Sequence, residues 1–253
     1  MISVVTALDN TIEVGHALTS STRINKVSFT GSTNVGKILM RQCAETTLKK
    51  ISLELGGNAP FIVFNDADLD AAVQGAIISK FRASGQTCVC ANRFYIQDGI
   101  YEEFAARLAA RVRDEFVVGD GLKSSRVTHG PLIHERAVQK AEEHVRDAVS
   151  KGAKVLVGGH KMPELGRSFF QPTVLTGMSA EMKLASEETF GPVAGLFRFK
   201  TEKEVIQLAN HTDTGLAAYL FSKDVQRAWR VARAIEAGMV GLNTGLISDA
   251  AAP

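Results

Sequence analysis

The sequence predicts an α/β fold, because short apolar strands alternate along it with longer amphipathic helices. The segment 26–30 reads KVSFT, which is typical of a short strand, and a glycine follows it directly. The segment 101–116 places apolar side chains four residues apart, which is the spacing of one helix face. Thr201 and Glu204 form a capping box, which indicates the start of a further helix.

The remaining predicted elements continue this alternation. Helices are expected at residues 11–18, 34–45, 68–82, 101–116, 135–151, 201–209 and 225–237. Strands are expected at residues 26–30, 50–55, 60–64, 94–96, 154–157 and 239–242. Gly152 ends the longest of these helices, because a glycine readily adopts the left-handed conformation that closes a helix.

The composition excludes several classes of protein. The chain has 253 residues, of which 45% are hydrophobic and 22% charged, and these values are ordinary for one large or two modest globular domains. A net charge of +2 gives no reason to expect nucleic acid or an anionic membrane as a partner. No apolar run reaches the ~20 residues that span a bilayer, and residues 1–10 lack the pattern of a secretory signal. We expect a cytoplasmic or mitochondrial protein that is not secreted.

The three cysteines, Cys43, Cys88 and Cys90, are too few and too unevenly placed for a disulfide framework. Sparse cysteines are typical of a reducing compartment. Cys88 and Cys90 also lack a second pair of cysteines or histidines at the spacing of a structural zinc site. We therefore expect no metal site.

The first motif that could bind a ligand is FTGSTNVG at residues 29–36. Gly31 and Gly36 let the backbone turn and approach a ligand, and a following helix offers free N–H groups to a phosphate. An ordinary strand–helix turn explains the pattern equally well. The spacing also nearly matches the phosphate loop of a nucleotide triphosphatase, but Ile38 stands where that loop needs Ser or Thr to hold Mg²⁺.

The second motif places Glu54 at the end of an apolar strand, directly before Gly56 and Gly57. Ligands often bind at this position in α/β folds, and a carboxylate there could act as a base. Strand alternation alone would also put Glu54 on a solvated face, opposite the leucines. Without further information the solvated reading is favoured.

The third motif, GQTCVC at residues 85–90, offers Cys88 as a nucleophile. The thiolate is the reactive form of cysteine, and Gly85 lets the chain turn and expose it. Most cysteines without a disulfide are small buried hydrophobes, although the polar residues before Cys88 argue against a core position. The fourth motif, EETFGP at residues 187–192, combines carboxylates, an aromatic residue and a turn, and suits either a ligand loop or a solvated loop.

The order and spacing of the four motifs resemble the aldehyde dehydrogenase superfamily. Its signatures occur here as FTGSTNVG, ELGGNAP, GQTC and EETFGPV, and the similarity runs from about residue 26 to the C-terminus. The resemblance implies the end of a Rossmann-type cofactor domain at residues 1–56, followed by an α/β catalytic domain at 57–253. It implies oxidation of an aldehyde through a thiohemiacetal and then a thioester on Cys88. Glu54 would activate the water that hydrolyses the thioester.

The same resemblance implies NAD or NADP as the cofactor, without choosing between them. Seven positions match the family's cofactor-binding residues, among them a carboxylate that holds the nicotinamide ribose and an aromatic ring beside the nicotinamide. They are Gly31, Ser32, Gly36, Leu55, Gly56, Glu188 and Phe190.

Within the superfamily, the segments SKFRASGQTCVCANR and VGLNTGLIS are similar to those of succinate-semialdehyde dehydrogenases. This similarity implies that Arg82 and Ser248 bind the distal carboxylate of succinate semialdehyde, the aldehyde that would be oxidised to succinate. A guanidinium suits this task because it binds a carboxylate through two parallel hydrogen bonds. The similarity to succinate-semialdehyde dehydrogenases also implies that Cys88 and Cys90 form a reversible redox pair.

Members of the family have longer chains, and both ends of this sequence look cut. We expect that the upstream part of the cofactor domain, with an oxyanion-binding Asn, and a downstream oligomerisation strand are missing. The 253-residue chain alone is therefore expected to have little or no activity. The complete protein is expected to be a homo-oligomer, either a dimer or a tetramer.

Two alternatives remain besides the weak nucleotide triphosphatase match. The protein could be an aldehyde dehydrogenase for another substrate, such as betaine aldehyde or a fatty aldehyde. It could also be an inactive truncated chain that keeps the fold for binding or assembly.

Overall fold

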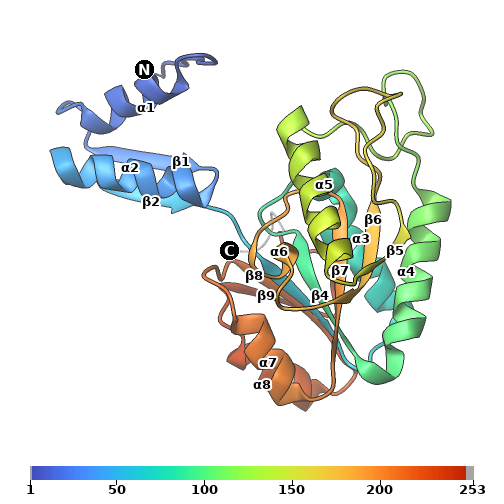
Figure 1. The fold of residues 1–253 in the computed structure, drawn as a ribbon. Helices are drawn as coiled ribbons and strands as arrows, with labels where there is room; N and C mark the ends of the chain where they lie inside the picture. The colour runs from blue at the N-terminus through green and yellow to red at the C-terminus, as the bar shows by residue number, and fades with distance from the viewer. Residues whose placement is uncertain (1, 249–253) are drawn as a thin grey trace. The chain divides into compact units, whose positions relative to one another are not determined.

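The computed structural model describes residues 2–248 and divides the chain into two units, Met1–Gly56 and Gly57–Pro253. In the first unit, β1 (Lys26–Thr30) and β2 (Lys50–Glu54) pair in parallel, with Lys26 opposite Lys50 and Thr30 opposite Glu54. Two helices, α1 (Thr11–Ser20) and α2 (Thr33–Thr46), contact each other (Figure 1). In β2, Ser52 and Glu54 are exposed whereas Ile51 and Leu53 are half-buried, as the alternation of a strand predicts.

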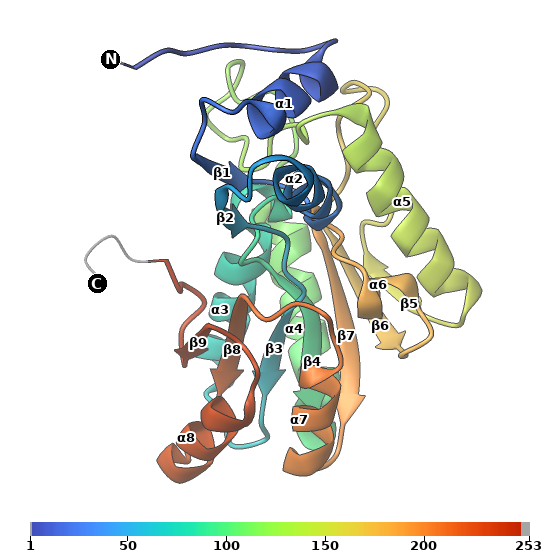
Figure 2. The same cartoon turned by 90° about the vertical axis from the view of Figure 1, so that its left-hand side faces the viewer.

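A seven-stranded sheet forms the centre of the second unit, in the order β5-β6-β7-β4-β3-β8-β9 (Figure 2). The strands are β3 (Ala59–Val63), β4 (Ala91–Gln97), β5 (Lys154–Val157), β6 (Thr173–Met178), β7 (Val193–Phe199), β8 (Ala217–Phe221) and β9 (Met239–Leu242). All neighbouring strands run parallel except the edge pair β5–β6, which is antiparallel. A largely parallel sheet must be covered on both faces, and this explains the continuous apolar runs in its central strands.

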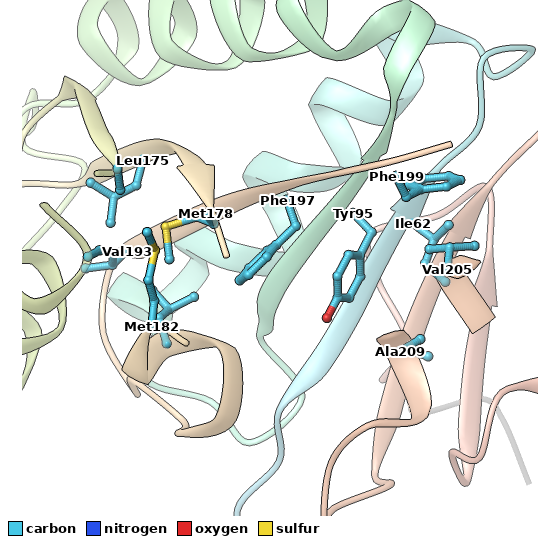
Figure 3. Close-up of a cluster of buried hydrophobic side chains, with 14 of the residues drawn as sticks. Ile62, Tyr95, Leu175, Met178, Met182, Val193, Phe197, Phe199, Val205 and Ala209 are labelled. Carbon is cyan, nitrogen blue, oxygen red and sulfur yellow. The ribbon is translucent and has the colours of Figure 1, made fainter. Parts of the chain in front are cut away.

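Helices cover both faces of this sheet. They are α3 (Leu69–Phe81), α4 (Tyr101–Glu115), α5 (Glu135–Ser150), α6 (Lys183–Ser186), α7 (Glu202–Asn210) and α8 (Val225–Ala234), with one-turn segments η1 (Arg82–Gly85) and η2 (Asp98–Ile100). Side chains of α3 and α4 pack with Phe61 and Phe94 on one face, whereas those of α5 to α8 pack with Ile62 and Tyr95 on the other. Figure 3 shows part of the second cluster. Alternating strand residues therefore supply two separate cores.

The predicted α/β fold is confirmed, and each predicted helix and strand occurs within a few residues of its expected position. One helix end was placed too late: the helix predicted at 225–237 ends at Ala234, because Ile235 adopts an extended conformation. Three strands, β6, β7 and β8, were not predicted. Among residues 2–248, the structure has no helix long and apolar enough to cross a membrane.

Candidate active site

The topology brings three of the four sequence motifs of the chain to one end of the large sheet, where its parallel strands begin. Gly57 precedes β3, Cys88 precedes β4 and Glu188 precedes β7. Because β3, β4 and β7 are parallel neighbours, the segments that lead into them lie at the same end of the sheet. Residues far apart in the sequence are therefore neighbours at the amino ends of these strands.

The loop that carries Cys88 has an unusual backbone. Helix α3 ends at Phe81, and Ala83, Ser84 and Gly85 then adopt positive φ angles of 51°, 53° and 74°. Two successive non-glycine residues in this region cost conformational energy, and such strain is often found at functional sites. The loop brings the chain back toward this end of the sheet, where the Cys88 side chain is partly exposed.

Gly57 links the nucleophile loop to the carboxylate loop. Its backbone N–H donates a hydrogen bond of 3.3 Å to Oε1 of Glu188. A Cβ atom added to Gly57 would lie 2.5 Å from the backbone oxygen of Cys88, so this close approach requires glycine. The three motifs thus meet at one residue.

Gly85 provides a second link. A Cβ atom at Gly85 would overlap the backbone oxygen of Gly191, and its φ of 74° also disfavours a side chain. The loop of Cys88 and the loop of Glu188 therefore pack backbone to backbone.

Two buried asparagines fix these loops further. Asn92 Nδ2 donates hydrogen bonds to Oδ1 of Asn58 at 2.6 Å and to the carbonyl of Glu187 at 3.1 Å. Its Oδ1 accepts from the N–H of Thr189 at 3.4 Å, and Asn58 Nδ2 donates to the carbonyl of Ala185 at 3.1 Å. Both asparagines are buried, so their amide groups depend on these partners.

Tyr219 supports the nucleophile loop from beneath. Its hydroxyl donates a hydrogen bond of 2.8 Å to the carbonyl of Val89, between the two cysteines. Burial raises the pKa of Tyr219, and the neighbouring Cys90 adds to the rise, so the hydroxyl keeps its proton and remains a donor. The charge of Arg82 opposes this rise.

Glu188 and Phe190 are the two residues of the EETFGP loop that match cofactor contacts. Burial raises the pKa of Glu188, whereas the Gly57 N–H bond and the charges of Lys140 and Lys80 oppose the rise. Phe190 is 38% exposed and has a φ of 52°, so a strained backbone presents its ring to solvent. A half-buried carboxylate beside an exposed ring is well suited to bind hydroxyl groups and a flat heterocycle.

Lys80 is a buried cation beside these loops. The side chain is 1% exposed, and burial lowers its pKa to about 8, while the neighbouring Cys90 and Glu188 oppose this shift. A buried ammonium carries a desolvation cost that its partners offset only in part. Near neutral pH this group therefore lowers the stability of the fold while supplying positive charge to the site.

Replacing Lys80 by methionine should raise the free energy of unfolding at pH 7 by about 1–3 kcal/mol, because it removes the cost of the buried charge. Above about pH 8 the folded lysine loses its proton while the unfolded one keeps it up to about 10.5. The free energy of unfolding of the wild-type protein therefore increases as the pH rises. The difference in this free energy between Lys80→Met and the wild type should become smaller. Urea unfolding of both proteins across this range measures the effect. A methionine variant that is less stable at pH 7 would contradict the assignment.

The remaining predicted cofactor residues belong to the first unit. Ser32 is the N-cap of α2, where its Oγ accepts a hydrogen bond of 3.4 Å from the N–H of Val35. A Cβ atom at Gly36 would strike the side chain of Leu55, so these two residues pack together. Glu54 is exposed at the end of β2, and Gly56 is partly exposed at the end of this unit.

The two predicted substrate residues lie in the second unit. Arg82 is exposed and directly follows α3. Ser248 is also exposed and is the last residue that the structure describes. The preceding Ile247 packs against the cluster on the α3–α4 face, against which Cys88 also packs.

Sequence reasoning missed several residues that shape the site. The structure adds Gly57, Asn58, Lys80, Asn92 and Tyr219. The second glycine of the Gly-Gly-Asn motif was a usable signal for Gly57. Asn58 follows directly in the same motif, but its partners could not be foreseen. Lys80, Asn92 and Tyr219 are single residues whose partners lie at least ten positions away, so no local pattern indicates their contacts.

A cavity of about 570 Å³ lies away from these loops, between α4 and the β5–β6 edge. Among the charged side chains that line it, Arg198 is already paired with Asp98 and Glu102. This cavity holds none of the four sequence motifs, so the end of the sheet around Gly57 remains the candidate site.

Comparisons with known proteins identify the family to which the sequence is similar. A sequence profile described as the Aldehyde dehydrogenase family matches residues 1–253. Three relatives are each 58% identical: 3-sulfolactaldehyde dehydrogenase and glutarate-semialdehyde dehydrogenase of Pseudomonas putida, and the NADP(+) succinate-semialdehyde dehydrogenase GabD of Escherichia coli. Each alignment covers 95% of this chain and 49% of the relative, so the chain spans about half the length of these proteins.

A solved structure gives the same result. The crystal structure of succinate-semialdehyde dehydrogenase from Burkholderia pseudomallei has a TM-score of 0.93 and 56% identity. The match covers 98% of this chain and 50% of that structure.

Proposed function

Because the chain belongs to the aldehyde dehydrogenase family, we propose that the protein oxidises an aldehyde with NAD or NADP through a covalent bond to Cys88. The observation that carries the proposal is the position of Gly57. Its backbone touches the Cys88 carbonyl and binds the Glu188 carboxylate, so the proposed nucleophile and the proposed cofactor carboxylate share one support.

The residues of the EETFGP loop fit a nicotinamide riboside. The carboxylate of Glu188 keeps acceptor capacity beyond its single bond to Gly57, and ribose hydroxyls are donors. Phe190 offers an exposed ring for a flat heterocycle. In the first unit, Gly31 and Ser32 precede α2, a 14-residue helix whose N-terminus suits a phosphate. When bound, the nicotinamide would supply the hydride acceptor.

The chemistry proposed for this chain's own residues begins at Cys88. Its thiolate attacks the aldehyde carbon, forms a sulfur–carbon bond and leaves an oxyanion, to which the Cys88 backbone N–H would donate a hydrogen bond. After oxidation the acyl group remains on Cys88 as a thioester. Glu54 then takes a proton from water, which attacks the thioester, and the breaking sulfur–carbon bond returns the thiolate.

The substrate we propose is a small aldehyde with an anionic far end, with succinate semialdehyde favoured. The three 58% identical relatives are named for succinate semialdehyde, glutarate semialdehyde and 3-sulfolactaldehyde, which carry a carboxylate or a sulfonate away from the aldehyde. Arg82 is an exposed guanidinium that directly follows α3 and begins the segment leading to Cys88. Ser248 is proposed as a second contact to the same anion.

Replacing Arg82 by leucine should raise KM for succinate semialdehyde by about 10–100-fold, because a charge-assisted hydrogen bond contributes about 1.5–3 kcal/mol. The KM for butanal, which has no anionic end, should change by less than about threefold. Steady-state kinetics of the complete gene product measures both KM values. Arg126→Leu, in an exposed loop, is the matched control and should change neither. An equal loss for both aldehydes would exclude Arg82 as the anion-binding residue.

The proposed function itself is tested by incubating the protein with succinate semialdehyde and either NAD⁺ or NADP⁺. Absorbance follows the formation of the reduced dinucleotide. A full panel should rank succinate semialdehyde, glutarate semialdehyde and 3-sulfolactaldehyde above neutral aldehydes. We also propose that the complete protein is a homo-oligomer, either a dimer or a tetramer. No turnover with any aldehyde by the complete gene product would contradict the proposal.

A further inference from the structure

His144 is a buried titratable residue that the proposed chemistry does not use. It lies on α5, its side chain is 1% exposed, and its helix is otherwise polar outward and apolar inward. A buried histidine requires hydrogen-bond partners for both ring nitrogens. Its partners are two residues of the EETFGP loop, which lies more than 40 positions further along the chain.

The two contacts define the state of the ring. Nδ1 lies 3.0 Å from Oγ1 of Thr189, and Nε2 lies 3.3 Å from Oε2 of Glu187. A carboxylate only accepts hydrogen bonds, so Nε2 must carry the proton. In the neutral ring Nδ1 is then an acceptor, and the Thr189 hydroxyl donates to it.

These contacts flank the residues proposed to touch the cofactor. Glu188 stands between Glu187 and Thr189, and Phe190 follows directly. Asn92 holds the backbone of residues 187 and 189, whereas His144 holds their side chains. The positive φ of Phe190 is unfavourable unless the surrounding structure maintains it. His144 and Asn92 therefore hold the loop together, His144 through side chains and Asn92 through the backbone.

Burial is the main reason that this ring stays neutral. Burial lowers the pKa of His144, and the charge of Lys140 lowers it further, while Glu187 and Glu143 oppose the shift. Glu187 faces the ring from the loop, and Lys140 and Glu143 belong to its own helix. As the pH falls below about 6.5, the unfolded chain binds a proton that the folded ring resists, so this site loses stability in acid.

We propose that His144 is a positioning residue that holds Glu188 and Phe190 in place for the dinucleotide through its bond to Thr189. The inference rests on the proposed function for the identity of the ligand. The Thr189 bond should matter more than the Glu187 bond, because Thr189 is 1% exposed whereas the Glu187 side chain is 52% exposed and well solvated.

Two substitutions separate the two bonds. The amide oxygen of His144→Asn can take the place of Nδ1 and accept from Thr189, whereas the amide nitrogen of His144→Gln can take the place of Nε2 and donate to Glu187. His144→Ala removes both. Val145→Ala is the matched control, because Val145 is buried on the same helix but lies toward Gly159.

The experiment measures amide hydrogen exchange of residues 186–191 and the Kd of NAD⁺ and NADP⁺ in the complete gene product. His144→Ala should speed exchange in this loop by about 10-fold or more and raise the Kd of the bound dinucleotide by about 10-fold. His144→Asn should restore most of both effects and His144→Gln little of either. Alkylation of Cys88 by iodoacetamide should remain within about twofold of wild type.

Three outcomes would overturn the inference. His144→Ala could leave loop exchange unchanged, Val145→Ala could match its effect, or His144→Gln could restore the loop as well as His144→Asn. If the wild-type protein binds neither dinucleotide, the proposed function fails. The exchange data alone then decide whether His144 holds the loop.

Discussion

Replacing Cys88 by alanine should lower kcat for aldehyde oxidation by more than about 10³-fold, because it removes the sulfur that forms the proposed covalent adduct. The fold should survive, since Cys88 is only partly buried and alanine is smaller. Steady-state kinetics measures the loss, and circular dichroism with urea unfolding verifies the fold.

Cys43→Ala is the matched control for this experiment. Cys43 is a buried cysteine of α2 in the first unit, and the variant should retain turnover within about twofold. Substantial turnover by the Cys88 variant would remove Cys88 as the nucleophile.

Replacing Gly57 by alanine should lower kcat by about 100-fold or more, although the change adds one methyl group. The new Cβ would lie 2.5 Å from the Cys88 carbonyl oxygen, and it cannot be accommodated unless the nucleophile loop moves. The same movement would disturb the N–H that binds Glu188. Overpacking of this kind also costs about 1–3 kcal/mol of stability. Kinetics, the alkylation rate of Cys88 and urea unfolding measure these effects.

Gly130→Ala controls for the loss of backbone freedom at a glycine. A Cβ at Gly130 would meet no atom within 4 Å, and its φ is not positive. It should leave kcat unchanged and leave stability unchanged or slightly increased. Equal effects at the two glycines would show that close packing at Gly57 does not hold the site.

The α/β fold could be predicted because its amphipathic helices carry strong periodic signals. Helix α4 begins at Tyr101, as expected, and α7 begins after the capping box of Thr201 and Glu204. Both signals are local, since they depend on side chains within two turns of one another.

The strands β6, β7 and β8 could not be predicted in the same way. They contribute three of the seven strands of the sheet, and β8 is buried at every position. A strand covered on both faces loses the alternation that identifies a strand, so AAYLF resembles a segment of buried helix as much as a strand. Pairing with distant neighbours then decides its conformation.

The site was predictable only in part. Family order identified Cys88, Glu54 and Glu188, and the structure places Cys88 and Glu188 on loops that both contact Gly57. The supporting residues could not be found from the sequence. His144 precedes Thr189 by 45 positions, and Asn92 precedes it by 97, so only the folded chain reveals their hydrogen bonds.

The central claim is that Cys88 forms the covalent adduct, and peptide mapping of the trapped acyl protein tests it most directly. Glu54→Gln removes the proposed base, so the thioester should accumulate when this variant receives succinate semialdehyde and the dinucleotide. After an acid quench, mass spectrometry should locate the acyl group on Cys88, and on neither Cys43 nor Cys90. An acyl group on another residue of the variant, or no acyl group on its Cys88 although the wild-type protein turns over, would contradict the account.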